Sequence, residues 1–538
     1  MDIPLPLPIL LDGATGTELY RRGMPEGSCT PAWVLEHPEA LLELQRCYVA
    51  AGAQVLTAPT FGADPASLAA FGLEKEAAEY NRRLVALSRE AAHGRALVAG
   101  DLAPCGMGEF AVREGRFEEI VDNYRVQVAA LAEAGVDLYV VETMVDMAEA
   151  RAALLAIGEA DPGKPVAVTF YCDEEGRTPS GVDVLAALIV MQGMGAAAFG
   201  LNCAKPEIIA EQLERLAPYA LIPLMAQPEG ARGMVDPAAW VERYAELGVR
   251  LFGGCCGTGA ADIAALREKL SALKPGPFVP REQDEDVIPC ASEREARFIT
   301  PDVDVGETIE CSPDLLEDIL EAEDSSPQGA LKIAILEEDD LDLFAAYQYA
   351  VEDALCLWSD VPELLEKALR LYQGRAFWDG TEDLERDFLA EMSGKYGLVI
   401  WKRVGESRQI SPAAGGAPPR PAAFCHLGEE QPYRPGSCQK ARRVGAQGGG
   451  NGVTGAGYPG GAEVDRHGVE GGLGGAHHDG HRAADGGVWA VGGDKLRPHP
   501  KGRAPRHWAH QQQRRGLRRD AQDVENGREG LGEQLQGP

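Results

Sequence analysis

The chain has 538 residues and a hydrophobic content of 45%, which is too long for one ordinary domain, so we expect two or more. Its formal net charge of −33 argues against nucleic acid or an anionic membrane as a partner. We expect no membrane span and no signal peptide, and the 12 cysteines then indicate the reducing cytoplasm, where cysteines serve as ligands or core residues.

A short apolar run recurs eight times between residues 5 and 256, and an amphipathic segment follows each run. Short apolar runs bounded by turn signals are typical of buried strands. The runs are Pro8–Leu11, Gln54–Thr57, Ala96–Gly100, Asp137–Val141, Pro165–Phe170, Ala196–Leu201, Leu221–Ala226 and Val249–Gly253. This alternation predicts an α/β fold, a (β/α)8 TIM barrel. A doubly wound sheet is the alternative, but no glycine-rich phosphate loop follows the first run.

Polar residues follow the ends of these runs, where a (β/α)8 barrel carries its active site. They include Asp12, Thr60, Asp101 and Glu142. A single carboxylate in such a position can instead cap the next helix, and this is the alternative for Asp12 and Glu142. The presence of several such groups at one rim favours a site.

Three cysteines stand at the ends of the sixth and eighth runs. Cys203 closes the sixth, while Cys255 and Cys256 lie in Gly253-Gly254-Cys255-Cys256-Gly257. Neighbouring side chains on a regular strand point to opposite faces, but the flanking glycines free the backbone to turn both sulfurs toward one point. Three thiolates with one open position are typical of a catalytic zinc site. The alternative is that these are buried core thiols.

Four motifs at these strand ends resemble the homocysteine S-methyltransferase family. They are Leu11–Thr17, Val141–Met144, Gly200–Cys203 and Gly253–Thr258, and the similarity covers about residues 5–272. The family includes the N-terminal homocysteine-binding barrel of cobalamin-dependent methionine synthase, together with the betaine and S-methylmethionine enzymes.

The resemblance implies the roles of the site residues. It implies that Cys203, Cys255 and Cys256 hold one zinc ion per chain. It also implies a substrate site in which Asp12 and Glu142 bind the amino group of homocysteine, with Gly13 and Thr60 beside them.

The chain departs from the family pattern at three places. Pro228-Glu229-Gly230 stands where Pro-Asn-Ala-Gly is usual, Pro59 stands where Asn is common, and Asp101 replaces a small neutral residue. These departures bear on which thiol is recognised, not on the binding of zinc.

Beyond the barrel, residues 1–272, we expect a linker at 273–287 and a small α/β module at 288–401. In the module, Leu331–Ile335 and Ala354–Leu357 are predicted as strands. Helices are predicted at Leu315–Glu323, Leu341–Val351 and Val361–Leu371. Ala368–Ala376 and Lys395–Ile400 faintly resemble the pterin-binding barrel of methionine synthase. No Asp-x-His-x-x-Gly cobalamin motif occurs, so any corrinoid must come on another protein.

Residues 402–538 differ from the rest of the chain in composition. They carry 20 basic and 14 acidic residues, 30 of the 64 glycines and 8 of the 10 histidines. Such a segment cannot bury a core, and we expect a disordered low-complexity tail. Out-of-frame translation of a G+C-rich gene explains the abrupt change, and a histidine-rich metal store is the alternative.

Together these features favour a zinc-dependent methyltransferase that makes methionine from homocysteine, with methylcobalamin on a separate corrinoid protein as donor. Three alternatives stay open. The substrate could be another small thiol, the donor could be betaine or S-methylmethionine, or the chain could be a non-catalytic zinc barrel that accompanies a corrinoid protein.

Overall fold

The computed structural model describes residues 3–230, 237–284, 286–300, 302–325, 329–381 and 383–401, which all belong to one compact unit. The predicted tail, residues 402–538, lies outside these ranges. Within them, none of the helices combines the length and the apolar content that crossing a bilayer requires.

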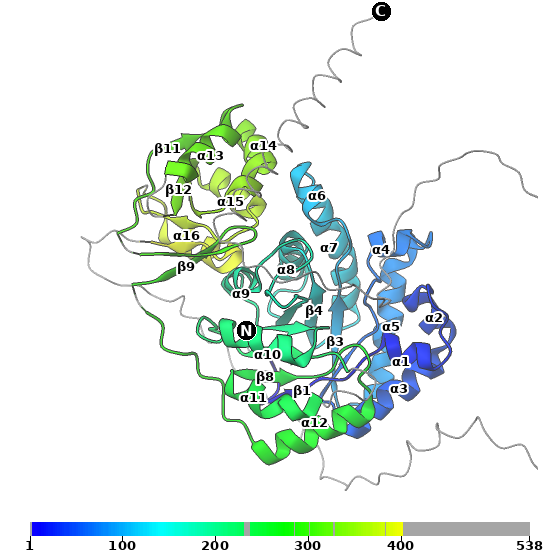
Figure 1. Ribbon diagram of the computed structural model, residues 1–538. Helices are drawn as coiled ribbons and strands as arrows, with labels where there is room; N and C mark the ends of the chain where they lie inside the picture. The colour runs from blue at the N-terminus through cyan, green and yellow to red at the C-terminus, as the bar shows by residue number, and fades with distance from the viewer. Residues whose placement is uncertain are drawn as a thin grey trace, which may run out of the picture. The chain divides into compact units, whose positions relative to one another are not determined.

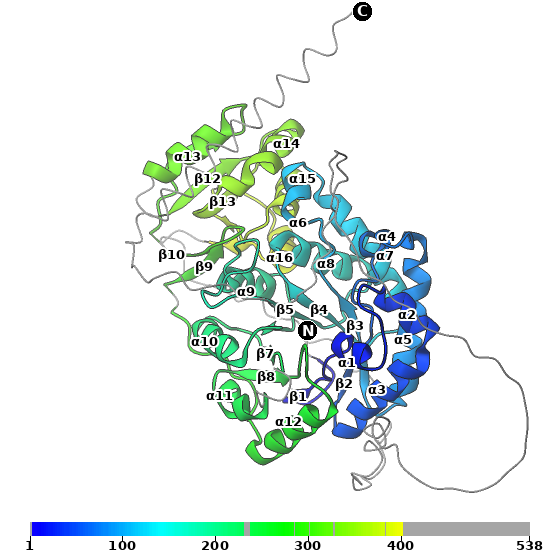
Figure 2. The same cartoon turned by 45° about the vertical axis from the view of Figure 1, so that its right-hand side comes forward.

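Eight parallel strands form the first sheet, inside a layer of helices (Figures 1 and 2). They are β1 (Ile9–Leu10), β2 (Val55–Thr57), β3 (Leu97–Leu102), β4 (Leu138–Met144), β5 (Val166–Phe170), β6 (Ala198–Asn202), β7 (Leu224–Gln227) and β8 (Val249–Phe252). The spatial order runs β1-β8-β7-β6-β5-β4-β3-β2, and a parallel bridge from Leu11 to Val55 joins the two ends. The predicted (β/α)8 barrel is therefore confirmed, and each predicted run overlaps one of the strands.

Outer helices such as α10 (Pro206–Leu216) bury an apolar stripe against the sheet. In α10 the buried Ile209, Leu213 and Leu216 recur at helical spacing, and Pro206 supplies the first residue. The helices of this part are α1 (Gly16–Arg21), α2 (Thr30–Glu36), α3 (Pro38–Ala51), α4 (Pro65–Ala69), α5 (Ala77–Ala92), α6 (Gly108–Arg113), α7 (Phe117–Glu133), α8 (Met147–Ala160), α9 (Val184–Gly193), α10 (Pro206–Leu216), α11 (Val241–Glu246) and α12 (Ala260–Leu273), with short 3-10 turns at Glu74–Glu76 and Pro237–Trp240.

The interior of the barrel changes from apolar to polar along the strands. Ala99, Val140, Ala167, Ala198 and Met225 belong to an apolar core inside the barrel, separate from the core beneath the outer helices. Because side chains alternate along a strand, residues two or four positions further on face the same way. These residues, here called the polar ring, are Thr57, Asp101, Glu142, Thr169, Asn202 and Gln227. The polar ring lies toward the carboxyl ends of the strands, where barrel enzymes carry their sites.

The second part of the chain adds an antiparallel hairpin and a five-stranded parallel sheet. The hairpin consists of β9 (Ile288–Ala291) and β10 (Ala296–Ile299). The sheet follows chain order: β11 (Thr308–Glu310), β12 (Ala330–Ala334), β13 (Ala354–Trp358), β14 (Phe377–Trp378) and β15 (Val399–Ile400). Helices α13 (Leu315–Ser325), α14 (Glu338–Tyr347), α15 (Pro362–Leu371) and α16 (Arg386–Tyr396) connect the strands, and Gln348–Ala350 forms a 3-10 turn. The predicted α/β module is confirmed, with more strands than expected.

The second part packs on the outer helices of the barrel. Arg151 of α8 is fully buried and donates to the backbone carbonyl of Leu369 at 3.0 Å. Arg370 of α15 pairs with Glu118 of α7 at 2.5 Å and with Glu159 of α8 at 2.7 Å. One apolar core extends through both parts, so the barrel and the second sheet stabilise each other.

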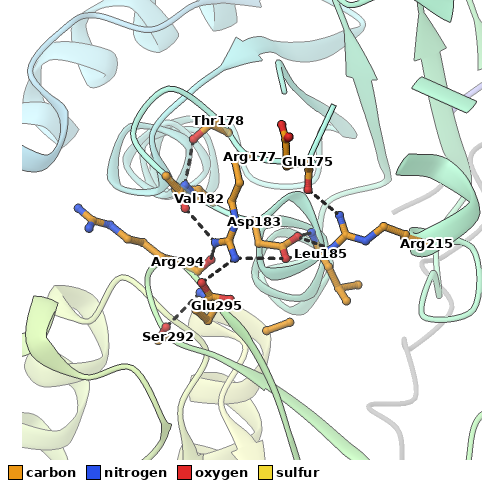
Figure 3. A network of polar contacts seen from close by, with 12 residues as sticks. Glu175, Arg177, Thr178, Val182, Asp183, Leu185, Arg215, Ser292, Arg294 and Glu295 are labelled. Atoms are coloured by element: carbon orange, nitrogen blue, oxygen red, sulfur yellow. Dashed lines mark hydrogen bonds and ion pairs between the residues drawn. The ribbon is translucent and has the colours of Figure 1, made fainter. Parts of the chain in front are cut away.

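Figure 3 shows the turn of the β9–β10 hairpin against the loop that follows β5. Arg177 of this loop lies 2.7 Å from Glu295 of the turn. The backbone N–H of Asp183 donates to the carbonyl of Arg294 at 2.9 Å, and Arg215 of α10 pairs with the Asp183 carboxylate at 3.0 Å. The hairpin thus fixes a loop that belongs to the carboxyl-end rim of the barrel.

Candidate metal and substrate site

The three predicted cysteines meet at the carboxyl ends of β6 and β8. The sulfurs of Cys203 and Cys255 are 2.9 Å apart, those of Cys203 and Cys256 are 3.4 Å apart, and all three lie within 4.8 Å of one another. Cys256 is exposed, whereas the other two are half-buried. The cluster therefore opens toward solvent on one side, where a small thiol can approach.

Backbone turns, not strand geometry, bring the sulfurs together. Cys203 adopts a left-handed conformation with φ of 59°, which ends β6 and turns its side chain toward the β8 loop. Gly257 has φ of 83°, and an added Cβ there would lie 2.0 Å from the carbonyl oxygen of Gly230. Only glycine fits such a position, so the Cys255-Cys256-Gly257 turn depends on it.

Hydrogen bonds hold these turns in place. The N–H of Cys203 donates to the carbonyl of Gln227 at 3.1 Å, and the N–H of Cys255 donates to that of Pro228 at 3.0 Å. The hydroxyl of Thr258 donates to the carbonyl of Cys255 at 2.6 Å. The sulfur positions are thus set by rigid strand ends before any ligand binds.

The donor set fits a metal ion such as zinc. Tetrahedral coordination with Zn–S bonds of about 2.3 Å places sulfurs about 3.8 Å apart, and the observed cluster is compact enough to reach that spacing by small rotations. Asn202 lies behind the cluster: its amide donates to the sulfur of Cys255 at 3.8 Å and to the hydroxyl of Thr143 at 2.7 Å. A polar partner that orients a ligand in this way is common at metal sites.

The three thiols have unequal acidity. Hydrogen bonds from Cys203 and Cys255 lower the pKa of the Cys256 thiol to about 3. The same contacts raise the pKa of Cys255 well above its ordinary value. The cluster therefore stabilises a thiolate in its exposed member, which is the form that binds metals.

Neither predicted carboxylate caps a helix. Helix α1 begins after Thr15, and the carboxylate that caps α8 is Asp146, while Glu142 lies within β4. Asp12 is 1% exposed, and its two oxygens accept hydrogen bonds of 2.9 Å from the backbone N–H and the hydroxyl of Thr57. Burial raises the pKa of Asp12 to about 7, although the bonds from Thr57 oppose the shift.

Glu142 faces a further carboxyl group, which the sequence places at the same rim but to which no role was assigned. This group is Asp101 of β3, which is 3% exposed and hydrogen-bonds the side chain of Glu142. Burial, followed by the charges of Asp12 and Cys256, raises the pKa of Glu142 to about 7. The pKa of Asp101 rises further through burial and through the charge of Glu142. One proton is therefore shared between the two carboxyl groups at neutral pH.

The two remaining predicted residues, Thr60 and Gly13, lie beside the backbone that carries these carboxyl groups. The hydroxyl of Thr60 donates to the backbone carbonyl of Asp101 at 2.8 Å and accepts from its N–H at 3.0 Å. A Cβ at Gly13 would lie 3.0 Å from the ring of Tyr48, so the first loop passes closely over α3. Their direct contact with substrate stays a prediction.

The sequence did contain a signal for Asp101. It follows the inward-facing Ala99 by two positions, so alternation alone turns its side chain into the barrel. Its contact with Glu142 was not predictable, because β3 and β4 pair in a register that places Asp101 beside Val140.

The fold and the thiol cluster define a class of protein, a (β/α)8 barrel with a candidate metal centre at its catalytic rim. Residues 9–270 match the family model described as homocysteine S-methyltransferase. The chain is 28% identical over 294 residues to homocysteine S-methyltransferase of Escherichia coli (strain K12), a match that covers 48% of this chain and 94% of that protein. The chain belongs to the homocysteine S-methyltransferase family.

Two further proteins are similar to this one. Methionine synthase of Mycobacterium leprae (strain TN) is 28% identical over 303 residues, which cover 50% of this chain and 25% of that protein. The solved structure of the metallated homocysteine methyltransferase MmuM from Escherichia coli is 31% identical, with a TM-score of 0.43, and the match covers 48% of this chain and 96% of that chain.

Proposed function

We propose that the protein is a zinc-dependent methyltransferase that transfers a methyl group to the thiol of homocysteine and yields methionine. The observation that carries the proposal is the meeting of three cysteine thiols beside the acidic pair Asp101 and Glu142 at one rim of the barrel. The thiols suit a metal and a substrate sulfur, and the carboxyl groups suit the amino group of an amino acid.

Cys203, Cys255 and Cys256 would hold one zinc ion and leave a fourth position for the substrate. Bound zinc would deprotonate the substrate thiol, whose ordinary pKa is about 8.5, and the negative charge of three thiolates would keep that sulfur nucleophilic. We also propose that the protein works in the cytoplasm, because thiol ligands are stable in a reducing compartment.

The residues of the chain would orient the substrate for attack. Glu142 lies close enough to Cys256 for their charges to interact, so one small molecule can contact both groups. A homocysteine anchored at its amino group and at its sulfur keeps little freedom, and the sulfur then points outward toward the methyl donor. Here we assign Asp12 and Glu142 to amine binding, with Gly13 and Thr60 shaping the same pocket.

The donor is proposed to be methylcobalamin carried by a separate corrinoid protein. The similarity to methionine synthase, which covers 25% of that protein, supports this choice. S-methylmethionine or betaine is the alternative donor, because the family also includes the betaine and S-methylmethionine enzymes.

A donor screen tests the proposal. The zinc-loaded full chain is incubated with homocysteine and, separately, with methylcobalamin, S-methylmethionine or betaine, and methionine is measured by mass spectrometry. We expect methionine with one donor, in amounts that exceed enzyme. Methylation of a different small thiol in preference to homocysteine would correct the substrate, and zinc binding without turnover on any donor would favour the non-catalytic alternative.

A further inference from the structure

We propose that Asp101 joins Glu142 and Asp12 in holding the ammonium group of the substrate, so that Asp101 contributes to selectivity for amino-acid thiols. This inference rests on the proposed function and assigns a role to a residue that departs from the family pattern.

The carboxyl group of Asp101, a member of the polar ring, has an unsatisfied hydrogen-bond acceptor. Asp101 is 3% exposed, and its Oδ1 atom has no hydrogen-bond partner among the described residues. The hydroxyl of Thr60 holds the backbone N–H and carbonyl of Asp101, and the side chain is buried inside the barrel. A buried oxygen without a donor costs free energy, which a ligand with N–H groups would recover.

Asp12 has less free acceptor capacity than Asp101. Both of its oxygens already accept hydrogen bonds from Thr57, which tie β1 to β2 at the point where the barrel closes. Because each carboxylate oxygen has two lone pairs, Asp12 can still accept a bond from an ammonium group, whereas Oδ1 of Asp101 has its full acceptor capacity free.

The charges favour a cationic occupant. Asp12, Asp101 and Glu142 interact with one another electrostatically, and no ion pair in the described part of the chain joins any of them to a lysine or arginine. Buried carboxylates without a cation are unfavourable. An ammonium group would compensate the charge of these carboxylates while donating hydrogen bonds to them. Within the described ranges, only the three cysteines form a group that suits a metal, which favours an organic cation between the carboxyl groups.

The proposal makes one substitution diagnostic. Asp101→Asn keeps the shape of the side chain but removes its charge, so it should weaken homocysteine binding about 10- to 100-fold, the effect of a hydrogen bond to a charged group. The same variant should leave the affinity for 4-mercaptobutyrate, which is homocysteine without its amino group, within about threefold of wild type. Zinc content should not change.

Isothermal titration calorimetry of the zinc-loaded full chain with each thiol measures both affinities. Asp161→Asn is the matched control, because Asp161 accepts a hydrogen bond from Tyr139 outside the polar ring. Asp101→Ser, which also removes the carboxyl group, provides a second variant should Asp101→Asn fail to fold: the homocysteine preference must fall, and an unchanged preference would overturn the proposal.

Two results for Asp101→Asn would also overturn it, namely unchanged homocysteine affinity or an equal loss for both thiols. A failure of the proposed function looks different. In that case, amine-dependent thiol binding would persist while no donor yields methionine.

Discussion

Replacing Cys256 by serine should remove zinc without unfolding the barrel. Cys256 is exposed and contributes nothing to the apolar cores, so its removal creates no cavity. Substituting a residue that hydrogen-bonds a metal ligand typically lowers the metal affinity about 10- to 100-fold. The loss of one of three protein ligands should lower it by more than that. We therefore expect the zinc affinity of Cys256→Ser to fall by more than about 100-fold, equivalent to about 2.7 kcal/mol.

The structure also supplies a graded comparison. Asn202 donates a hydrogen bond to the sulfur of Cys255 but is not itself a thiol ligand. Asn202→Ala should therefore lower the zinc affinity about 10- to 100-fold. Cys29→Ser, which changes the residue before α2, should leave the zinc affinity unchanged.

Competition with a chromophoric chelator, on reduced protein of verified zinc content, gives the three affinities. The melting temperature of each metal-free variant checks the fold. The reasoning would be refuted by wild-type zinc affinity in Cys256→Ser, or by equal losses in Cys256→Ser and Cys29→Ser.

Three further predictions follow from buried charges and from the boundaries of the fold. The folded pKa of Asp12 is about 7 and lies above its unfolded value, so Asp12 stabilises the metal-free protein at low pH, and this contribution is lost as the pH rises from about 4 to 7. The melting temperature of Asp12→Asn should therefore rise relative to that of the wild type across this window. A difference between the two melting temperatures that does not change with pH would contradict the shift. Arg151→Ala should cost about 2–4 kcal/mol, seen as a lower melting temperature, because it leaves a cavity and unpaired carbonyls between barrel and second sheet. The exposed Arg46→Ala is its control and should change nothing. A chain that ends after Trp401 should keep its melting temperature, zinc and any activity, and loss of activity with zinc retained would show that residues 402–538 are needed.

The barrel was predictable because each of its strands carries its own signal. A strand that is buried on both faces has a short apolar sequence. Eight such runs with helices between them are compatible with few folds other than a (β/α)8 barrel. The strand bounds differ from the runs by one to three residues, as for β7, which begins at Leu224 and not at Leu221. There Pro223 precedes the strand and cannot donate to a sheet.

The second sheet was only partly predictable. Strands β12 and β13 have five residues each and are apolar, whereas β14 and β15 have two residues each and carry no periodicity. The hairpin strand β10 contains Arg297 and the partly exposed Phe298, because one of its faces meets solvent. Such short or mixed segments are formed by tertiary pairing, which no local pattern encodes.

The site shows the same division. The thiol cluster was predictable from Gly253-Gly254-Cys255-Cys256-Gly257, since this motif serves a turn and not a core. The acidic pair was not, because it depends on two side chains that meet across neighbouring strands. From the sequence, Asp101 was a rim residue and a departure from the family pattern, without an assigned partner.

Zinc K-edge X-ray absorption of the reduced full chain, recorded before and after addition of homocysteine, tests the central claim most directly. The account predicts three sulfur ligands and one lighter ligand without substrate, since three cysteines converge at the site. After homocysteine is added, the zinc should have four sulfur ligands, and Cys256→Ser should bind too little zinc for the experiment. A coordination shell that homocysteine leaves unchanged would contradict the account, because the substrate sulfur would then not occupy the open position.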